Sequence, residues 1–565
     1  MTIHLVGDGP ASEAVAAALG DSDAQIARSA EPSIADATLA VVVGASDSGV
    51  FERANEQALA GGTPWLAVEI GGIGGLPAVD ASVAGLGPGA CYDCLAGRVA
   101  ANTDDAPDSD GAPSASTARF AGAVAGRLAV DAISGGDLVG TVVELPHRER
   151  QFLPLPGCSC GDHDRGAIRR GFEDVPLDAA VQRGEYAVDD RVGIVSEVGE
   201  ASSFPTPYYL AQLCDTSGFS DATAARQAAG VAVDWNAAFM KAIGEGLERY
   251  SAGVYREADL DRATAAELAR PVGPSAFVTP DADFDAGAER LWTPAVDLDT
   301  DQRVQVPASM VYYPPPGEQY RPPVTTGLGL GNSTDEALLA GLYEVIERDA
   351  TMLSWYSTYE PLGLDVDADT FETLERRAAA ENLTVTPLLL TQDVDVPVVG
   401  VAVHREEWPR FAVGSAADLD PNEAAVSALA EAIQNWMELE TMGPEQASEE
   451  SGAIGTYADF PEQARDLVAV DGTVPADSVG PDEPPTGAAE LDALVSRVAD
   501  AGLDVCAARL TTRDLAALGF ESVRVLVPSA QPLFFDDPFF GERARTVPET
   551  LGFEPRLDRQ HHPYP

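Results

Sequence analysis

Three segments rich in glutamate hold the residues of this chain best suited to chemistry. They are GEGLERYS around Glu245, NSTDEALLAGLYEVIERDA at 332–350, and ALAEAIQNW around Glu431. Each segment predicts a helix whose acids or amides lie three or eight residues apart and can share a face. Like charges so spaced cost a helix roughly 0.2–0.5 kcal/mol per pair unless a cation lies between them. Carboxylates grouped in this way suit magnesium ions that bridge the phosphates of ATP. The grouped residues are Glu245 with Glu248, Glu336 with Glu344 and Glu347, and Glu431 with Gln434.

The competing explanation is ordinary solvated surface, because 91 Asp and Glu stand against 35 Lys and Arg. The segment 332–350 argues against that explanation. Its apolar residues leave the predicted helix apolar on nearly every side, as in a buried helix. Buried carboxylates must be paired, protonated or bound to metal. A functional role is therefore favoured for Glu344 and Glu347, and also for Glu245, Glu248 and Glu431.

The composition describes a large, very acidic protein. A chain of 565 residues exceeds one hydrophobic core, so two or three domains are expected. The net charge is -56, and Lys241 is the only lysine beside 34 arginines. This composition resembles that of proteins from halophiles that accumulate salt, where a Debye length of about 3 Å or less screens self-repulsion. We expect the fold to loosen in low salt.

The same charge excludes two classes of partner. Strong acidity disfavours nucleic acid and anionic membranes. The N-terminal sequence MTIHLVGDGPASEAV lacks the basic and apolar regions of a secretory signal, and no apolar run approaches the roughly 18 residues of a membrane span. The sequence predicts a cytoplasmic protein.

Four of the six cysteines form two close pairs. Cys91 and Cys94 lie in GACYDCLAGR, and Cys158 and Cys160 lie in PGCSCGDH. Two such pairs are what a tetrahedral structural zinc with four thiolates needs. A redox pair and unrelated buried thiols are the alternatives. The remaining two, Cys214 and Cys506, are expected in the core.

Residues 1–170 are expected to form an α/β, Rossmann-like domain. Short apolar strands at 3–6, 38–43 and 64–69 alternate with helical stretches at 11–19 and 51–60, which predicts a parallel sheet with helices on its faces. A loop is predicted at 102–117, then a helix at 118–133 and a strand at 139–144. The opening VGDGPAS is an incomplete dinucleotide loop, because Ser12 replaces the third glycine and Pro10 removes an N–H group. A tight strand-to-helix turn without nucleotide is favoured there.

Residues 190–565 are expected to form an α+β domain that holds all three glutamate segments. Strands are predicted at 384–390, 398–403 and 523–527. The acidic stretch 440–490, with its prolines and glycines, is predicted to be a partly flexible surface insertion.

Several motifs together resemble one family. The segments GEGLERYSAG, TTGLGLGNSTDEALLAGLYEVIERDA and LDPNEAAVSALAEAIQNW, with the ending HHPYP, resemble the ATP-binding and C-terminal motifs of the YcaO family. The first domain, with ANEQALAGGTPWLAVEIGG and ACYDCLAGR, is similar to the ThiF-like (ubiquitin-activating-enzyme-like) domain that accompanies YcaO enzymes making thiazole- and oxazole-modified peptides. The resemblance implies an ATP-dependent cyclodehydratase in the maturation of bacteriocin-like peptides. Such an enzyme phosphorylates a peptide amide oxygen after attack by a Cys, Ser or Thr side chain.

The resemblance also implies roles for individual residues. Six glutamates would hold magnesium, namely Glu245, Glu248, Glu336, Glu344, Glu347 and Glu431. Asn332, Arg249, Arg348 and Gln434 would contact nucleotide or phosphate, although Arg249 and Arg348 could equally be ion-pair partners of the neighbouring acids. Two residues depart from the family pattern: Ala242 stands where a serine is common, and Trp436 stands where some members have an arginine.

The C-terminus has two interpretations. In ring-forming members of the family a proline-rich end enters the active site, which would make Pro563 and Pro565 catalytic, although His561 stands where a first proline is expected. The alternative is a frayed tail with exposed His561 and His562. The first interpretation predicts that a C-terminal tag abolishes turnover.

Other functions stay open. The same ATP chemistry supports thioamide formation, and a zinc-stabilised docking scaffold without turnover is a third possibility. The substrate is expected to be a peptide or protein. We see no extra N-terminal module for leader recognition, so a separate recognition protein or an oxidase is a possible partner, and a homodimer is possible.

Overall fold

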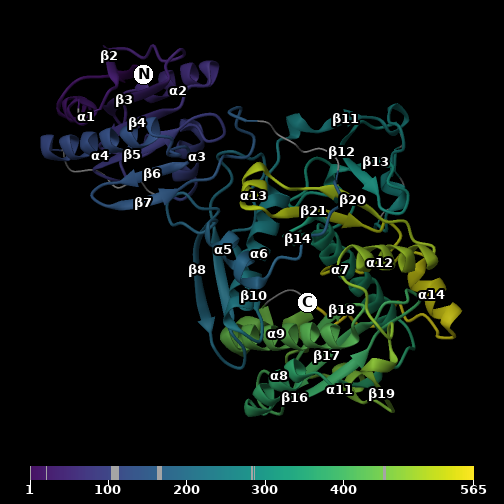
Figure 1. The fold of residues 1–565 in the computed structure, drawn as a ribbon. Helices are drawn as coiled ribbons and strands as arrows, with labels where there is room; N and C mark the ends of the chain where they lie inside the picture. Colours follow the sequence, from purple (N-terminus) through teal and green to yellow (C-terminus); the bar gives the residue numbers. More distant parts are fainter. Residues whose placement is uncertain are drawn as a thin grey trace.

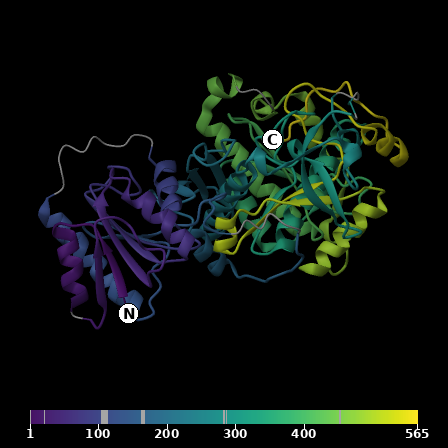
Figure 2. The ribbon, with the colours of Figure 1, turned by 90° about the horizontal axis from the view of Figure 1, so that it is seen from above.

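The computed structural model describes residues 2–20, 22–103, 114–161, 168–280, 284–285, 287–449 and 453–565. The chain forms two lobes that lie side by side (Figures 1 and 2). The N-terminal lobe contains the first seven strands, and the larger lobe contains the remaining strands. None of the described helices is both long and apolar enough to cross a bilayer.

The N-terminal sheet has the order β2-β1-β3-β4-β5-β6-β7. Its first four strands are parallel, as expected, but β5 to β7 run antiparallel, which the prediction of a parallel sheet had missed. The connection between β4 and β5 is too short for the crossover helix that a parallel neighbour needs. The strands are β1 (Thr2–Val6), β2 (Gln25–Ser29), β3 (Leu39–Ala45), β4 (Trp65–Ile70), β5 (Ala81–Leu86), β6 (Thr141–Glu144) and β7 (Arg148–Gln151).

Four helices accompany this sheet, and α1 packs against α4. They are α1 (Pro10–Gly20), α2 (Val50–Gly61), α3 (Tyr92–Ala101) and α4 (Ala115–Ile133). The α4 helix begins within the predicted loop 102–117, because Ser114 caps it by accepting a hydrogen bond from the Thr117 N–H. Residues 104–113 of that loop lie outside the described residues.

The opening VGDGPAS forms a strand-to-helix turn with a structural reason for its first glycine. Gly7 has φ +97°, and a side chain there would meet the Val43 carbonyl oxygen at 2.4 Å. Pro10 begins α1, where a missing N–H costs nothing. The glycine therefore serves close packing against β3.

The larger lobe has three sheets and is α+β, as expected. Their orders are β10-β9-β8, β11-β12-β20-β21-β14 with β13 beside β12, and β18-β17-β16-β15-β19. The strands are β8 (Val195–Ser202), β9 (Tyr208–Leu213), β10 (Gln227–Val231), β11 (Asp261–Ala263), β12 (Arg290–Asp297), β13 (Arg303–Pro307), β14 (Leu328–Gly331), β15 (Leu362–Asp365), β16 (Thr384–Leu389), β17 (Val398–His404), β18 (Phe411–Ala417), β19 (Thr473–Pro475), β20 (Cys506–Arg509) and β21 (Glu521–Leu526).

Three long helices of this lobe coincide with the predicted glutamate segments. They are α6 (Trp235–Gly253), α7 (Thr334–Trp355) and α9 (Pro421–Glu449). The α7 helix packs on β14 and β21 and also on β18 and β17, which explains why it is apolar on nearly every side (Figure 1). The other α-helices are α5 (Leu177–Glu185), α8 (Asp369–Ala380), α10 (Ala453–Tyr457), α11 (Glu462–Val468), α12 (Ala488–Asp500), α13 (Arg513–Leu518) and α14 (Arg543–Leu551).

The predicted surface insertion 440–490 is mostly exposed or half-buried in its described part, but it contains more regular structure than its composition indicated. It continues α9, forms α10 and α11, and adds β19 as a parallel partner of β15. Tyr457 and Leu467 are buried in the core of the lobe. These apolar side chains are sparse among acids and prolines, so composition alone concealed them.

Candidate active site

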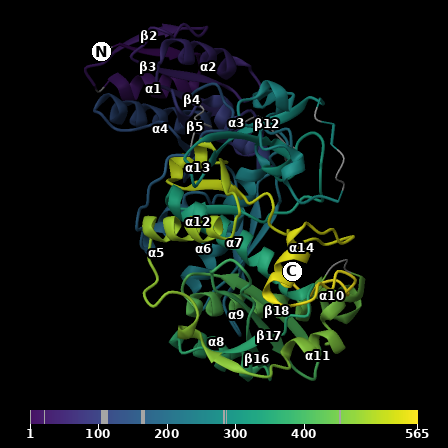
Figure 3. The same cartoon turned by 90° about the vertical axis from the view of Figure 1, so that its right-hand side faces the viewer.

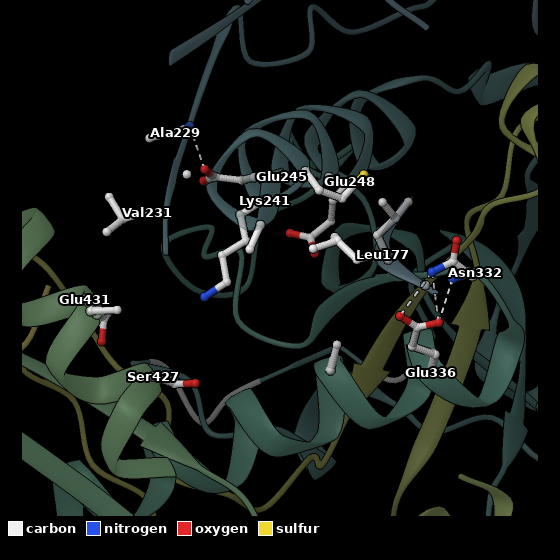
Figure 4. A pocket seen from close by; sticks show the side chains of 18 of the residues that line it. Leu177, Ala229, Val231, Lys241, Glu245, Glu248, Asn332, Glu336, Ser427 and Glu431 are labelled. Atoms are coloured by element: carbon white, nitrogen blue, oxygen red, sulfur yellow. Dashed lines mark hydrogen bonds between the residues drawn. The ribbon is translucent and has the colours of Figure 1, made fainter. Parts of the chain in front are cut away.

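A pocket of about 620 Å³ lies where α6, α7 and α9 approach one another (Figure 4). Its volume falls in the usual range for sites that bind small molecules. Four of the predicted magnesium residues line it together with both predicted nucleotide-binding amides. These lining residues are Glu245, Glu248, Glu336, Glu431, Asn332 and Gln434.

Backbone N–H groups hold four of the six glutamates in place. One oxygen of each carboxylate accepts such a bond, so the backbone occupies only one of the two oxygens. In three of the pairs the donor lies on the strand or turn 16 or 17 residues before the glutamate. The pairs are Ala229 with Glu245 at 2.8 Å, Gly327 with Glu344 at 2.9 Å, Asn332 with Glu336 at 2.9 Å, and Ser415 with Glu431 at 2.7 Å.

Burial raises the pKa of three of the carboxylates, Glu248, Glu347 and Glu431. Desolvation raises the pKa of Glu248 to about 7, against the favourable charge of Arg249. Desolvation likewise raises the pKa of Glu347 to about 8, against Arg348 and in the same direction as Glu431. Acids that remain partly protonated near neutral pH are typical of sites completed by a metal ion or of active sites.

Glu344, Glu347, Arg249 and Arg348 lie behind the pocket rather than on its wall. Arg249 pairs with Glu245 and Glu248, at 3.3 Å in each case. Arg348 pairs with Glu347 at 3.3 Å and with Glu431 at 3.6 Å, and so joins α7 to α9. The ion-pair role that the sequence left open for both arginines is therefore present.

The two departures from the family pattern are both buried. Ala242 is packed in the core. Trp436 donates from its indole N–H to the Pro409 carbonyl at 3.2 Å and lies under the guanidinium of Arg405. Neither side chain lines the pocket.

The C-terminal residues are anchored, so the frayed-tail interpretation is wrong. The Trp355 indole donates to the Gln560 carbonyl at 2.9 Å, and the Tyr457 hydroxyl donates to the His561 carbonyl. Tyr564 is only 1% exposed. The end of the chain thus packs against α7 and α10 (Figures 1 and 3).

His562 contradicts the expectation of an exposed side chain. It is fully buried, with its Nε2 atom 2.7 Å from the Phe534 carbonyl oxygen. Burial lowers its pKa to about 3, so the ring is neutral at physiological pH. The neighbouring prolines differ: Pro563 is buried and Pro565 is half-buried.

The four paired cysteines converge in the N-terminal lobe. Their sulfur atoms lie within 4.8 Å of one another, with Cys91 and Cys94 each 3.5 Å from a sulfur of the second pair. A zinc ion with Zn–S bonds of about 2.3 Å would separate its tetrahedral ligands by about 3.8 Å. The donor set therefore fits a structural zinc. Cys214 and Cys506 are buried, as predicted.

Helix α13 of the larger lobe closes over this cysteine cluster. Arg513 donates to the Cys160 sulfur at 3.3 Å and to the Gly89 carbonyl at 2.9 Å. The next residue, Asp514, pairs with Arg98 of α3 and accepts a hydrogen bond from Tyr250 of α6 at 2.7 Å. The helix that carries Cys94 is thus connected to the helix that carries Glu245 and Glu248.

Sequence reasoning missed two polar residues of the pocket wall, Lys241 and Ser427. It also missed Arg321, which lines a small cavity beside Arg348. The uniqueness of Lys241 as the only lysine was a usable signal, whereas Ser427 and Arg321 have no distinctive local context.

Comparison with known proteins places these motifs in a family. A family model described as YcaO cyclodehydratase, ATP- and Mg2+-binding, matches residues 229–531, slightly more than half of the chain. An uncharacterized protein of Methanothermobacter thermautotrophicus is 31% identical over 207 residues, which are 34% of this chain and 52% of that relative. The chain spans about half the length of this curated relative.

Two solved structures resemble the chain over nearly its whole length. A heterocyclase in complex with substrate and cofactor has 22% sequence identity and a TM-score of 0.73, covering 98% of this chain and 83% of that chain. The heterocyclase TruD has 20% identity and a TM-score of 0.67, covering 98% of this chain and 82% of its own. At these identities the likeness establishes the fold alone, a mixed α/β fold similar to that of the two heterocyclases.

Proposed function

The chain belongs to the YcaO family, and from that membership we propose that it uses ATP to convert Cys, Ser or Thr residues of a peptide into thiazoline or (methyl)oxazoline rings. The observation that carries this proposal is the approach of carboxylates from α6, α7 and α9 to a pocket of about 620 Å³. Oxygen ligands on three separate helices suit magnesium bound to a nucleotide.

The proposed reaction has two stages. The side-chain sulfur or oxygen of the substrate residue attacks the preceding amide carbonyl and loses its proton, and the carbonyl oxygen takes the γ-phosphoryl group of ATP, releasing ADP. The C–O bond then breaks, phosphate leaves, and loss of the amide proton completes the C=N bond. The net change in the peptide is loss of one water per ring.

The residues of the site divide this work. We assign magnesium binding to Glu245, Glu248, Glu336, Glu344, Glu347 and Glu431, and nucleotide contacts to Asn332 and Gln434. Magnesium, when bound, neutralises phosphate charge as it develops during transfer. Arg249 and Arg348 keep the carboxylates oriented through their ion pairs, and we also propose phosphate contacts for both. We propose that the carboxyl end of the chain, with Pro563 and Pro565, lies near Glu347 and faces the bound peptide.

For the N-terminal lobe we propose a ThiF-like domain with a structural zinc on Cys91, Cys94, Cys158 and Cys160. Its parallel strands β1 to β4 support the first assignment, and the convergence of four sulfurs supports the second. We propose that this lobe holds a peptide substrate or a leader-recognition partner beside the catalytic lobe. We further propose that the acidic composition adapts the protein to concentrated salt.

The experiment that tests the activity uses purified full-length protein in concentrated KCl with Mg-ATP. Short peptides encoded beside the gene, containing Cys, Ser and Thr, serve as substrates, and intact peptide mass and phosphate release are measured together. Glu431→Gln removes a proposed ligand, and Glu440→Gln changes an exposed acid of the same helix as the matched control.

Loss of one water per modified residue, abolished by Glu431→Gln and retained in Glu440→Gln, is the expected result. A mass change that corresponds to exchange of oxygen for sulfur, seen when sulfide is added, would identify the activity as thioamide formation instead of ring formation. If neither a mass change nor phosphate release is detected, the result would favour a docking scaffold without turnover.

A further inference from the structure

Lys241 points into the pocket from α6, one turn before Glu245 (Figure 4). Of the described residues that line the pocket, it is the only cationic one, and four of the others are glutamates. A wall with this excess of negative charge repels the phosphates of a nucleotide unless cations are supplied. Lys241 is the one such cation that the wall itself contains.

The ammonium group is not used to pair a carboxylate. Among the described residues, no hydrogen bond and no ion pair within 4.0 Å involves Lys241, whereas Arg249 and Arg348 both contact glutamates of the site at 3.3 Å. Its pKa is lowered by desolvation, against the opposing charges of Glu431 and Glu423. Three N–H donors therefore remain free to meet a ligand in the pocket.

The composition of the chain strengthens this point. The protein has 34 arginines and a single lysine. Every ion pair among the described residues uses arginine, including the deeply buried pairs of Arg98 and Arg150. Arginine offers a planar fork for carboxylates, whereas lysine is a compact point charge on a flexible stem that suits phosphate from several directions. The one lysine of the chain lies on the wall of the pocket and points toward its centre (Figure 4).

We infer that Lys241 binds the phosphate chain of the nucleotide directly, as a fixed cation beside the magnesium ions. This inference rests on the proposed ATP-dependent function. Lys241 on α6 faces Glu431 on α9 across the pocket, so a phosphate chain between the two helices would meet the ammonium on one side and metal-binding carboxylates on the others (Figure 4).

Binding measurements separate this role from a structural one. Lys241→Met and Lys241→Arg are compared with the unchanged protein for adenosine, AMP, ADP and ATP, with magnesium, by calorimetry. Lys241→Met should weaken the binding of ADP and ATP by on the order of tenfold or more, as expected for loss of a charged hydrogen bond. The affinity for adenosine should stay unchanged. Lys241→Arg should restore only part of the affinity. Equal weakening of adenosine and ATP, or no weakening, would overturn the inference.

The single lysine permits a second, direct readout. An amine-reactive acylating reagent can modify only Lys241 and the N-terminal amine, and peptide mass spectrometry distinguishes the two. Mg-ATP should protect Lys241 and not the N-terminal amine, while magnesium with adenosine should protect neither. Lack of protection in a protein that binds ATP would refute the role of Lys241 and leave the proposed function intact. Absence of ATP binding by the unchanged protein would instead refute both.

Discussion

Arg98 and Asp514 form an ion pair in which neither side chain has any exposed surface. Arg98 lies on α3 beside the cysteine cluster, and Asp514 lies 416 residues later on α13 of the larger lobe. Tyr250 of α6 donates to the same carboxylate. The pair therefore fixes the N-terminal lobe against the helix that carries Glu245 and Glu248.

Removal of one partner of this pair should destabilise the protein strongly. Arg98→Met leaves the Asp514 charge buried without a cation, which typically costs about 3–5 kcal/mol. Urea unfolding in concentrated KCl measures the loss. Arg53→Met, which breaks an exposed pair with Glu31, is the control and should cost no more than about 1 kcal/mol. Equal effects of the two variants would show that the buried pair contributes nothing special.

The raised pKa values of Glu248 and Glu347 predict that the stability of the ligand-free protein and its affinity for Mg-ATP change in opposite directions with pH. The pKa of Glu248 rises from an ordinary 4.5 to about 7, and that of Glu347 to about 8. The folded state therefore binds more protons than the unfolded state between these values, so the stability of the ligand-free protein should fall as pH rises from about 5 to 8. Magnesium requires ionised carboxylates, so Mg-ATP affinity should rise over the same interval.

Unfolding midpoints and calorimetric titrations at pH 6, 7 and 8 check both trends. Glu248→Gln cannot ionise and should reduce the slope of ligand-free stability with pH. The same slope in this variant and the unchanged protein would show that Glu248 does not titrate in this range.

Local pattern was sufficient for the helices of the three glutamate segments and for the pairing of the cysteines, and insufficient for the arrangement of the site. The periodicity of α7 and the short spacing of Cys91 and Cys94 are local signals that the structure preserves. In contrast, the edge strand β2 and the antiparallel β5 have no distinctive pattern. The partner of Arg98 lies hundreds of residues away, and the convergence of α6, α7 and α9 results from the packing of separate sheets. From the sequence, only the family resemblance predicted that the glutamates of these three helices form one site.

The cysteine cluster predicts one zinc ion per chain. Cys94→Ser removes a ligand from a buried site and should abolish zinc binding and lower the thermal unfolding midpoint, because structural zinc contributes directly to folding. Metal content by elemental mass spectrometry and melting curves measure both effects. Cys214→Ser changes a buried thiol outside the cluster and should retain the metal. Purified protein that contains no zinc after expression in zinc-supplemented medium would contradict the prediction.

The net charge of -56 predicts a strong dependence on salt. The Debye length is about 10 Å at 0.1 M salt and about 3 Å at 1 M, so repulsion among surface acids is screened only in the concentrated solution. The melting temperature should fall by at least several degrees when KCl is reduced from 3 M to 0.1 M. Sucrose, which does not screen charge, should recover little of that loss. An unchanged melting temperature would show that self-repulsion is unimportant.

The buried end of the chain predicts that residues appended after Pro565 impair catalysis more than folding. Tyr564 is only 1% exposed, and the Trp355 indole of α7 donates to the Gln560 carbonyl at 2.9 Å, which places the tail against α7. Added residues would have to leave through this packed region and displace Pro563 and Pro565. Phosphate release with a peptide substrate should be lost in a protein with a short C-terminal tag, while a cleavable version should regain it after the tag is removed. The melting temperature of the tagged protein should stay close to that of the untagged one. A tagged protein with full activity would remove the carboxyl end of the chain from the proposed mechanism.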